Sequence, residues 1–516
     1  MSKKWLTPLR HLNKRVEQKK PLRVRWWLPG HTRPKETSLF ILTYPDDPDF
    51  LNSPVAQFVQ TDPKKRALHD LMKAVWADPR VRLAVRKDLA PPDQLPAKPG
   101  APALAAEVTV ALAIVRRLLG WSYRVLASEV DGSVGWRWVC SLYNHPMPTF
   151  QAIQGREAQL KPKTLRVINR VVVELSVQLG LTAGVRLRLD ATVTETNVHY
   201  PTDSSLLDDA ARVLSRCVKR ARTLCRPLTA ADQAWFRDRH RAAHHLAAHI
   251  SQLHRPGAKP AKNAEQVGYR RLIALVERLV AQVAEVQKRL KQLASGKAKR
   301  LAEALAHYGP LVQQVIDQSR RRVLDGQSVP ANEKLVSLFE AHTAIIRRGK
   351  VKPKETEFGR KLWFAEVDGG LVTEWRILEG NPPDEPEVLP SVRHHRRLFE
   401  RAPREVSGDR KLHSLNNERQ ARKLGVKRVC LPKPGHTTAR RRRYERQRWF
   451  RAARRFRAGI EGRISQLRRA RRLGRCLNHG VAGLERWVGW GVIANNLAVI
   501  ATHLNKHKVT LAEALT

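Results

Sequence analysis

The pattern of apolar and polar residues changes its period along the chain, and each change marks an expected element. Over residues 185–194 every second residue is apolar, which predicts a strand with Asp190 on its polar face. Two further apolar runs, 362–367 and 371–378, flank the turn-forming residues at 368–370. This arrangement predicts a β-hairpin.

A second acidic residue follows another short apolar segment. Residues 405–408 predict a strand that leads directly into Asp409, an expected helix then ends at Gly425, and a further strand covers 426–431. Asp409 is therefore expected at a strand end just before a crossover. Open α/β sheets place their ligands at that position.

Between the first strand and the hairpin, residues 206–322 have helical periodicity. Within this segment apolar residues alternate by four and three positions from Leu272 to Leu293, which is typical of a buried helix seam. We interpret the seam as part of an intramolecular helical hairpin, with residues 255–262 supplying the first turn. A dimer interface is the alternative.

The N-terminal part divides into a basic segment and a helical segment. Residues 1–103 are expected to be a basic arm and a Pro-rich linker, and residues 104–180 a helical DNA-binding domain. The turn at 120–123 is compatible with a helix-turn-helix unit, although a small helical packing domain fits equally well. The candidate DNA contacts in this turn are Trp121, Tyr123 and Arg124.

Composition indicates the class of partner. The chain has 516 residues, with 96 Lys and Arg against 47 Asp and Glu, which gives a net charge of +49 and predicts a polyanionic partner. A hydrophobic fraction of 42% is enough for two to four domains. The five cysteines form no CxxC pair, which argues against a disulfide framework and a zinc ribbon and favours a reducing cytoplasm. The apolar segment 487–504 is interrupted by glycines and asparagines, so we expect a buried helix there, with no membrane partner.

The run 440–475 is the most basic part of the chain. Its apolar residues recur at helical spacing, and at ~100° per residue Arg457, Glu461 and Arg468 fall within roughly 40° of one another. A carboxylate between two cations, together with two aspartates at strand positions, suggests metal-dependent phosphoryl chemistry on nucleic acid. Carboxylates are the ligands that Mg²⁺ prefers.

Three motifs resemble those of the RNase H-like DDE transposases of bacterial insertion sequences, in particular the group often filed as ISNCY. The segment DATVTETNVHYPTDSS at 190–205 is similar to the first-aspartate segment, and GDRKLHSLNN at 408–417 to the second-aspartate motif. The spacing of Arg457, Glu461 and Arg468 resembles the signature around the third acid. The chain departs from the family at three positions, since it has Leu412 for an aromatic residue, Arg468 for lysine and Arg454 for tyrosine.

The resemblance implies an α/β fold, in which an RNase H-like mixed-sheet catalytic domain at 181–516 is interrupted by a helical insertion at about 206–330. It also implies a DDE triad of Asp190, Asp409 and Glu461 that binds Mg²⁺ or Mn²⁺, cleaves DNA at the element ends and joins them to target DNA. The implied partners are double-stranded DNA of the element ends and target, bound as a homodimer in the bacterial nucleoid. The candidate DNA contacts near the triad are Arg410, Lys411, Arg454, Arg457 and Arg468.

Other assignments remain open on the sequence. Any of the acids after the first strand, Glu195, Asp203, Asp208 and Asp209, could replace a metal ligand, with loop or cap chemistry as the alternative. His413 and Asn417 could orient phosphate, and for His413 a hydrogen bond at a helix start is the alternative. The histidines at 240–254 include pairs four residues apart that could bind zinc, but a solvated helix face is the alternative. A catalytically inactive DNA-binding remnant acting as a repressor is the rival function, and an RNA-binding protein would also be basic.

Overall fold

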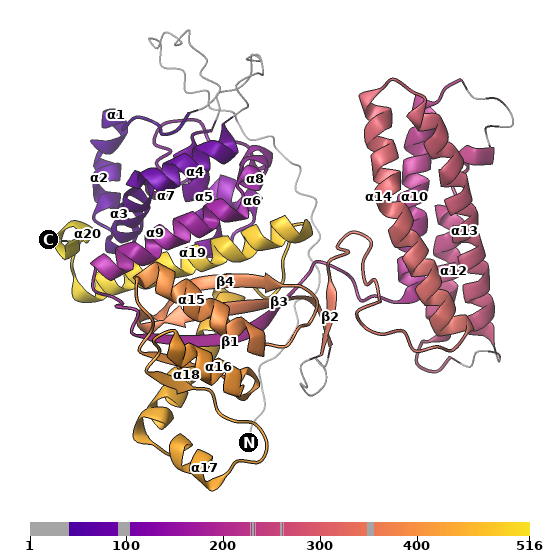
Figure 1. Cartoon of the computed structure of the whole chain (residues 1–516). Helices are drawn as coiled ribbons and strands as arrows, with labels where there is room; N and C mark the ends of the chain where they lie inside the picture. Colours follow the sequence, from indigo (N-terminus) through magenta and orange to yellow (C-terminus); the bar gives the residue numbers. More distant parts are fainter. Residues whose placement is uncertain are drawn as a thin grey trace, which may run out of the picture.

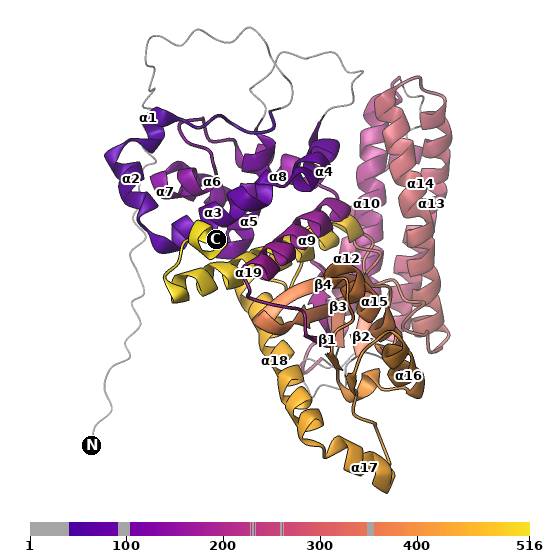
Figure 2. The same cartoon turned by 60° about the vertical axis from the view of Figure 1, so that its left-hand side comes forward.

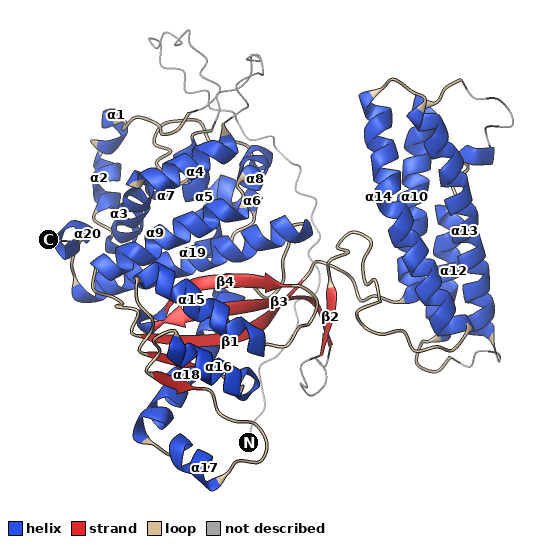
Figure 3. Cartoon of the chain, viewed as in Figure 1, coloured by secondary structure: helices blue, strands red, loops and turns tan. Residues whose placement is uncertain are grey.

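The computed structural model combines a mixed β-sheet with two groups of helices (Figures 1 and 3). It describes residues 41–90, 104–347 and 356–515, apart from 228, 230–231, 233, 259–260 and 262. Helices predominate. One group packs on the sheet, and the other forms a bundle beside it, next to strand β2, in both views (Figures 1 and 2).

The sheet contains six described strands in the order β2-β3-β1-β5-β6, with β4 also paired to β3. Their bounds are β1 (Arg186–Glu195), β2 (Ala344–Arg347), β3 (Thr356–Val367), β4 (Leu371–Leu378), β5 (Glu405–Ser407) and β6 (Arg428–Cys430). β3 is antiparallel to β1, β2 and β4, whereas β1, β5 and β6 are parallel. The predicted strands and the β3–β4 hairpin are confirmed.

The hairpin turn requires glycine. Gly369 and Gly370 have φ values of 80° and 79°, in the region that side chains with a Cβ rarely adopt. The carboxylate of Asp368 accepts hydrogen bonds from the backbone N–H groups of Ala183 and Arg186, at 3.3 and 2.8 Å. The turn thereby fixes the start of β1, the strand that carries Asp190.

The nine helices before β1 that the structure describes differ from the expected arm. They are α1 (Pro48–Leu51), α2 (Pro54–Gln60), α3 (Pro63–Ala77), α4 (Pro79–Leu89), α5 (Ala106–Leu119), α6 (Tyr123–Asp131), α7 (Val134–Val139), α8 (Phe150–Gln159) and α9 (Pro162–Gln178). Residues 1–40 lie outside the described residues, but 48–89 are folded helices whose apolar side chains enter the main core. The expectation of an arm and linker over 1–103 is therefore wrong for this stretch.

The first four of these helices begin with the same local device. Asp47, Ser53, Asp62 and Asp78 each accept a backbone N–H of the helix that follows, and each precedes a proline. Proline at the first helical position has a suitable φ and lacks an N–H that would otherwise need a partner. The four helix starts thus follow directly from local sequence.

Helices after the hairpin cover both faces and the parallel edge of the sheet. They are α15 (Val388–Phe399), α16 (Leu415–Lys423), α17 (Ala439–Glu445), α18 (Arg448–Ala470), α19 (Gly480–His507) and α20 (Leu511–Leu515), with short turns η3 (Asp368–Gly370), η4 (Glu385–Glu387) and η5 (Arg410–Leu412). The basic segment 440–475 forms two helices, α17 and α18, because a turn at 446–447 interrupts the helix.

Helix α19 returns to the N-terminal helices and packs against α3, α5 and α9 as well as β4. The helices at 104–180 therefore share a core with 480–507 and are not a separate domain. Asn496 explains the polar interruption in this apolar helix, since its side chain bonds both backbone groups of Val372, at 3.0 and 2.8 Å, beside a β-bulge. No helix in the described ranges is both long and apolar enough to cross a membrane.

The predicted helical insertion is a bundle with its own core. It contains α10 (Asp203–Leu224), η1 (Ala234–Phe236), α12 (His240–Leu253), α13 (Ala264–Lys291), α14 (Gly296–Ser319) and the π-helical turn η2 (Arg320–Leu324). The seam of α13 from Leu272 to Leu290 is buried against the other helices of the same chain. The intramolecular interpretation of the seam is therefore confirmed for these residues.

We expect the double substitution Leu279→Asp and Val286→Asp to unfold the bundle. Both side chains are buried, and an unpaired carboxylate in an apolar core typically costs several kcal/mol. Limited proteolysis of residues 203–324 and thermal melting by circular dichroism measure the effect. Val267→Asp, on an exposed position of α13, is the matched control; equal protease resistance of all variants would contradict a buried seam.

Candidate carboxylate site beside a basic helix

The two predicted aspartates lie close together where the short strand β5 ends beside β1. In the parallel pair β1–β5, Arg188 is opposite Ser407, and Asp190 and Asp409 each follow two residues later. The side chains of both aspartates line one cleft. Parallel pairing thus brings together two acids that are far apart in sequence.

Asp190 is held in place by one backbone and one side-chain contact. Its Oδ1 accepts a hydrogen bond from the N–H of Ala191 at 2.8 Å, and its Oδ2 accepts one from Nη2 of Arg457 at 3.2 Å. The side chain remains 17% exposed at the cleft. It is therefore accessible to a ligand while its orientation is fixed.

Asp409 is positioned by a helix cap. Its Oδ1 accepts the backbone N–H of Lys411 at 2.9 Å, at the start of η5. The preceding Gly408 leaves room for the buried side chain of Leu412, since a Cβ on Gly408 would lie 2.3 Å from Leu412 Cδ1. Leu412 therefore anchors this loop in the core.

Glu461 reaches the site through an arginine. Nη1 of Arg457 donates to Oε1 of Glu461 at 2.6 Å, so the guanidinium of Arg457 bridges Glu461 and Asp190. The side chain of Glu461 is 63% exposed. Arg457 also lines a second cleft together with Asp409. Arg457 therefore contacts two of the three predicted acids and shares a cleft with the third.

The carboxylate oxygens of Asp190, Asp409 and Glu461 are suitable ligands for a hard divalent cation, but they do not form one preassembled binding site. Mg²⁺ prefers carboxylate oxygens and completes its shell with water and phosphate oxygens. Among the described residues, the carboxylates of Asp190, Asp409 and Glu461 do not all lie within 4.8 Å of one another. The positive charge between Asp190 and Glu461 is that of Arg457, so a metal ion that used both acids would have to displace its guanidinium.

Basic side chains line both clefts around the acids. The first contains Arg347, Lys361 and Lys411, and the second contains Arg410, Arg451, Arg454, Arg455 and Arg457. Lys361 is paired with Asp384 at 2.7 Å, whereas Arg454 and Arg410 are exposed. The second cleft can therefore hold polyanions such as phosphodiesters, with arginine able to bind phosphate in a bidentate manner. The first cleft has as many acidic as basic side chains.

Arg468 has a different place from the other predicted contacts. It lies 3.4 Å from the hydroxyl of Thr192 and 3.7 Å from a carboxylate oxygen of Glu357. These contacts join α18 to β1 and β3. The structure thus places Arg468 beside the sheet, where it positions the helix that carries Arg457 and Glu461.

The sequence analysis missed the ion cluster that holds α18 against the sheet. Glu366 on β3 is fully buried and pairs with Arg188 of β1 at 2.7 Å and with Arg463 of α18 at 3.1 Å. Arg188 also donates to the backbone carbonyl of Phe456 at 2.7 Å. A Cβ on Gly459 would lie 2.2 Å from Arg188, so glycine permits this close approach. One feature of the sequence could have indicated this cluster: Arg188 lies on the same polar face of the strand as Asp190, two residues before it.

The candidate contacts in the N-terminal turn are mostly committed to packing. The ring of Tyr123 lies 4.1 Å from the guanidinium of Arg116, which is paired with the buried Glu157, and burial raises the pKa of Tyr123. Trp121 is half-buried against another tryptophan. Arg124 is exposed over an aromatic ring and is the member of the three that remains accessible to a ligand.

Several alternative site residues have structural contacts instead. Asp203 is buried and pairs with Arg322 at 2.5 Å and with Gln318 at 3.0 Å. Asn417 donates to the backbone carbonyls of Glu385 and Leu412, at 2.8 and 3.0 Å. The first contacts join helices of the bundle, and the second fix the loop that follows Asp409.

Glu195 and His413 also have identifiable surroundings. The backbone of Glu195 bonds Gly474 and Cys476, which closes the end of β1. His413 lies 3.6 Å from Glu418, and burial is the main cause that lowers its pKa. Neither residue is among those that line the two clefts.

The chain matches no protein-family model, no curated protein and no solved structure. What it can do must therefore be inferred from the site. That site combines Asp190 on β1, Asp409 just after the parallel strand β5, a glutamate on an adjoining helix and a neighbouring cleft lined by five arginines.

Proposed function

We propose that this chain is a DDE transposase that cleaves and joins DNA strands by metal-dependent phosphoryl transfer. The observation that carries the proposal is the placement of Asp190 and Asp409 in one cleft, each two residues beyond the paired Arg188 and Ser407, with Glu461 linked to Asp190 through Arg457. The mixed sheet, in which antiparallel strands precede two parallel crossovers, supports an RNase H-like arrangement.

Asp190 and Asp409 would hold the metal ions, with Glu461 completing the ligand set. Bound divalent cations would stabilise both the attacking and the leaving oxygen of an in-line displacement at phosphorus. The protein's own contribution is positioning. The hydrogen bonds from Ala191 and Lys411 fix the two aspartates before any ligand binds, which reduces the reorganisation needed during the reaction.

Arg457 would exchange its partners when DNA and metal bind. In the structure its guanidinium neutralises Asp190 and Glu461, and it already faces the cleft that contains Asp409. A phosphate entering that cleft would offer the guanidinium a new anionic partner, which would release Asp190 and Glu461 to hold a divalent cation. Arg410, Arg451 and Arg454 would hold the flanking phosphates.

A catalytically inactive DNA-binding protein acting as a repressor is the second candidate function. One observation favours it. Arg457 satisfies Asp190 and Glu461 without a metal ion, as in a purely structural ion pair. The two functions differ in whether the acids are needed for strand cleavage or only for folding.

We expect each of Asp190→Asn, Asp409→Asn and Glu461→Gln to reduce Mg²⁺-dependent nicking of DNA that carries the sequences flanking the gene by at least about 100-fold. Loss of one ligand removes several kcal/mol of transition-state stabilisation. Gel analysis of strand cleavage measures this loss, and a mobility-shift assay checks that binding persists. Glu400→Gln, an exposed acid on the same domain, is the control. Unchanged nicking in the three variants, or none in the parent, would favour the repressor.

Affinity for DNA is expected to fall steeply with salt. Each phosphate contact releases counterions and adds about 0.9 to the slope of log affinity against log salt. The double substitution Arg454→Ala and Arg455→Ala should therefore lower the slope by about 2. Fluorescence anisotropy at several salt concentrations measures the slope, with Lys506→Ala on α19 as the control. An unchanged slope would show that the arginine-lined cleft does not contact DNA.

A further inference from the structure

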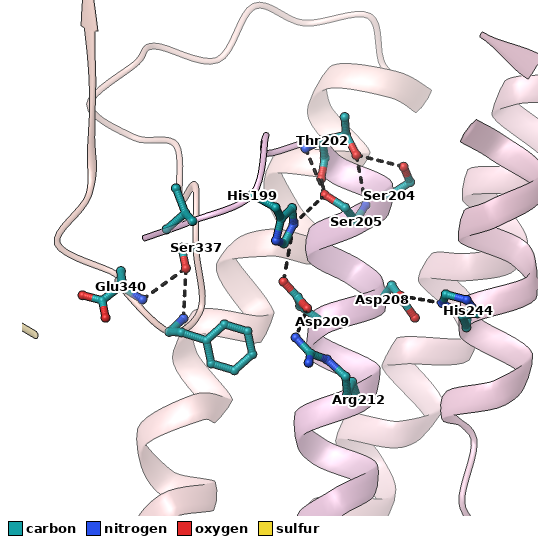
Figure 4. Close-up of polar contacts among 12 residues, drawn as sticks. His199, Thr202, Ser204, Ser205, Asp208, Asp209, Arg212, His244, Ser337 and Glu340 are labelled. Atoms are coloured by element: carbon teal, nitrogen blue, oxygen red, sulfur yellow. Dashed lines mark hydrogen bonds and ion pairs between the residues drawn. The ribbon is translucent and has the colours of Figure 1, made fainter. Parts of the chain in front are cut away.

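A cluster of metal-ligating side chains lies in the helical insertion, outside the carboxylate site. Asp208 comes from α10, and His240 and His244 come from α12, four residues apart on one face of the helix. Figure 4 shows the carboxylate of Asp208 directed toward the ring of His244. Spacing along the chain could not reveal this acid, since it belongs to a different helix.

The donor atoms are already close to the separation that a metal ion needs. Oδ2 of Asp208 lies 2.9 Å from Nδ1 of His244, and Oδ1 lies 3.5 Å from Nε2 of His240. All three ligand atoms lie within 4.8 Å of one another, the closest such group among the described residues. Zinc bonds of 2.0 to 2.1 Å at tetrahedral angles place the ligand atoms about 3.4 Å apart.

Packing holds the two helices at this distance. The inward face of α12 consists of small or apolar residues, Ala243, Ala247 and Ile250, which are buried against α10 and α13. At the start of α12, Asp238 accepts the backbone N–H of His240 at 2.9 Å. The backbone that carries the two histidines is therefore fixed independently of their rings.

The polar surroundings leave Asp208 available to a cation. The neighbouring Asp209 contacts Arg212 and His199 (Figure 4). Its Oδ2 lies 3.7 Å from Nε2 of His199. Asp208 is 19% exposed, and its buried Oδ1 accepts no hydrogen bond from the described residues. His244 is 62% exposed, so an ion can enter from solvent.

We propose that Asp208, His240 and His244 form a Zn²⁺ site that ties α12 to α10. Imidazole nitrogens with one carboxylate are a ligand set for zinc and similar transition metals, whereas Mg²⁺ prefers oxygen ligands alone. Three protein ligands leave the fourth position to water. The site is separate from the carboxylate cleft, and its role is to fix the shortest helix of the bundle against its neighbour.

The alternative is an ion pair between Asp208 and protonated histidines, with no metal. The two possibilities differ in measurable ways. A metal site binds one equivalent of Zn²⁺ with a defined ligand geometry, and binding stabilises the fold by mass action. An ion pair gives neither result.

The test uses the full-length protein after treatment with a chelator. Competition with a chromophoric zinc indicator gives stoichiometry and affinity, and the visible bands of bound Co²⁺ report four-coordinate geometry. We expect one tight equivalent, and a loss of at least about 100-fold in affinity for Asp208→Asn, His240→Ala and His244→Ala. His249→Ala, an exposed histidine on the same helix, is the matched control and should bind like the parent.

Thermal melting provides a second measurement in case a ligand variant is less stable. Zinc should raise the melting temperature of the parent and of His249→Ala but not that of Asp208→Asn. The proposal is overturned if the parent binds no stoichiometric zinc, or if His249→Ala loses as much affinity as the ligand variants. Asp190→Asn should bind zinc normally, which separates this result from the fate of the proposed function.

Discussion

Glu366 has no exposed side-chain surface, and the arrangement of the site depends on how its charge is neutralised. Arg188 reaches it from β1 and Arg463 from α18, so one carboxylate joins two strands and a helix. Removing one partner of such a buried cluster typically costs about 3 to 5 kcal/mol, because an uncompensated charge remains. Together with the contacts of Arg468 to Thr192 and Glu357, this cluster holds α18 against the sheet and so sets the positions of Arg457 and Glu461 relative to Asp190.

The local pattern of the sequence was sufficient for the strands and for the insertion. Alternation identified β1, the turn residues identified the β3–β4 hairpin, and the seam in α13 identified the bundle. Each of these signals is local. The starts of α1 to α4 also have a local signal, an Asp or Ser followed by proline at 47–48, 53–54, 62–63 and 78–79. This signal was not used for the prediction, because the basic N-terminal segment was interpreted as an arm.

The relations that could not be predicted all join distant segments. The guanidinium of Arg457 contacts Asp190 across the sheet edge, and Asp208 meets His244 only because α10 and α12 pack together. The distinctive segment at 190–205 is also explained by such contacts: Thr202 caps α10, Asp203 pairs with Arg322, and Ser204 bonds Tyr269. Much of that segment joins the sheet to the bundle, and of its residues Asp190 and Ala191 line the cleft. The periodicity of apolar residues shows which face of a helix or strand is buried, but it does not show which residues of another segment pack against that face.

The packing of α19 against α3, α5 and α9 has a consequence for synthesis. The helices near the amino terminus leave the ribosome first, yet their apolar surfaces are covered by residues 480–507, which are made more than 300 residues after α9 ends. During translation these surfaces remain open and are vulnerable to aggregation. The core can close only after the sheet and the bundle have been synthesised, so the order of folding differs from the order of the chain.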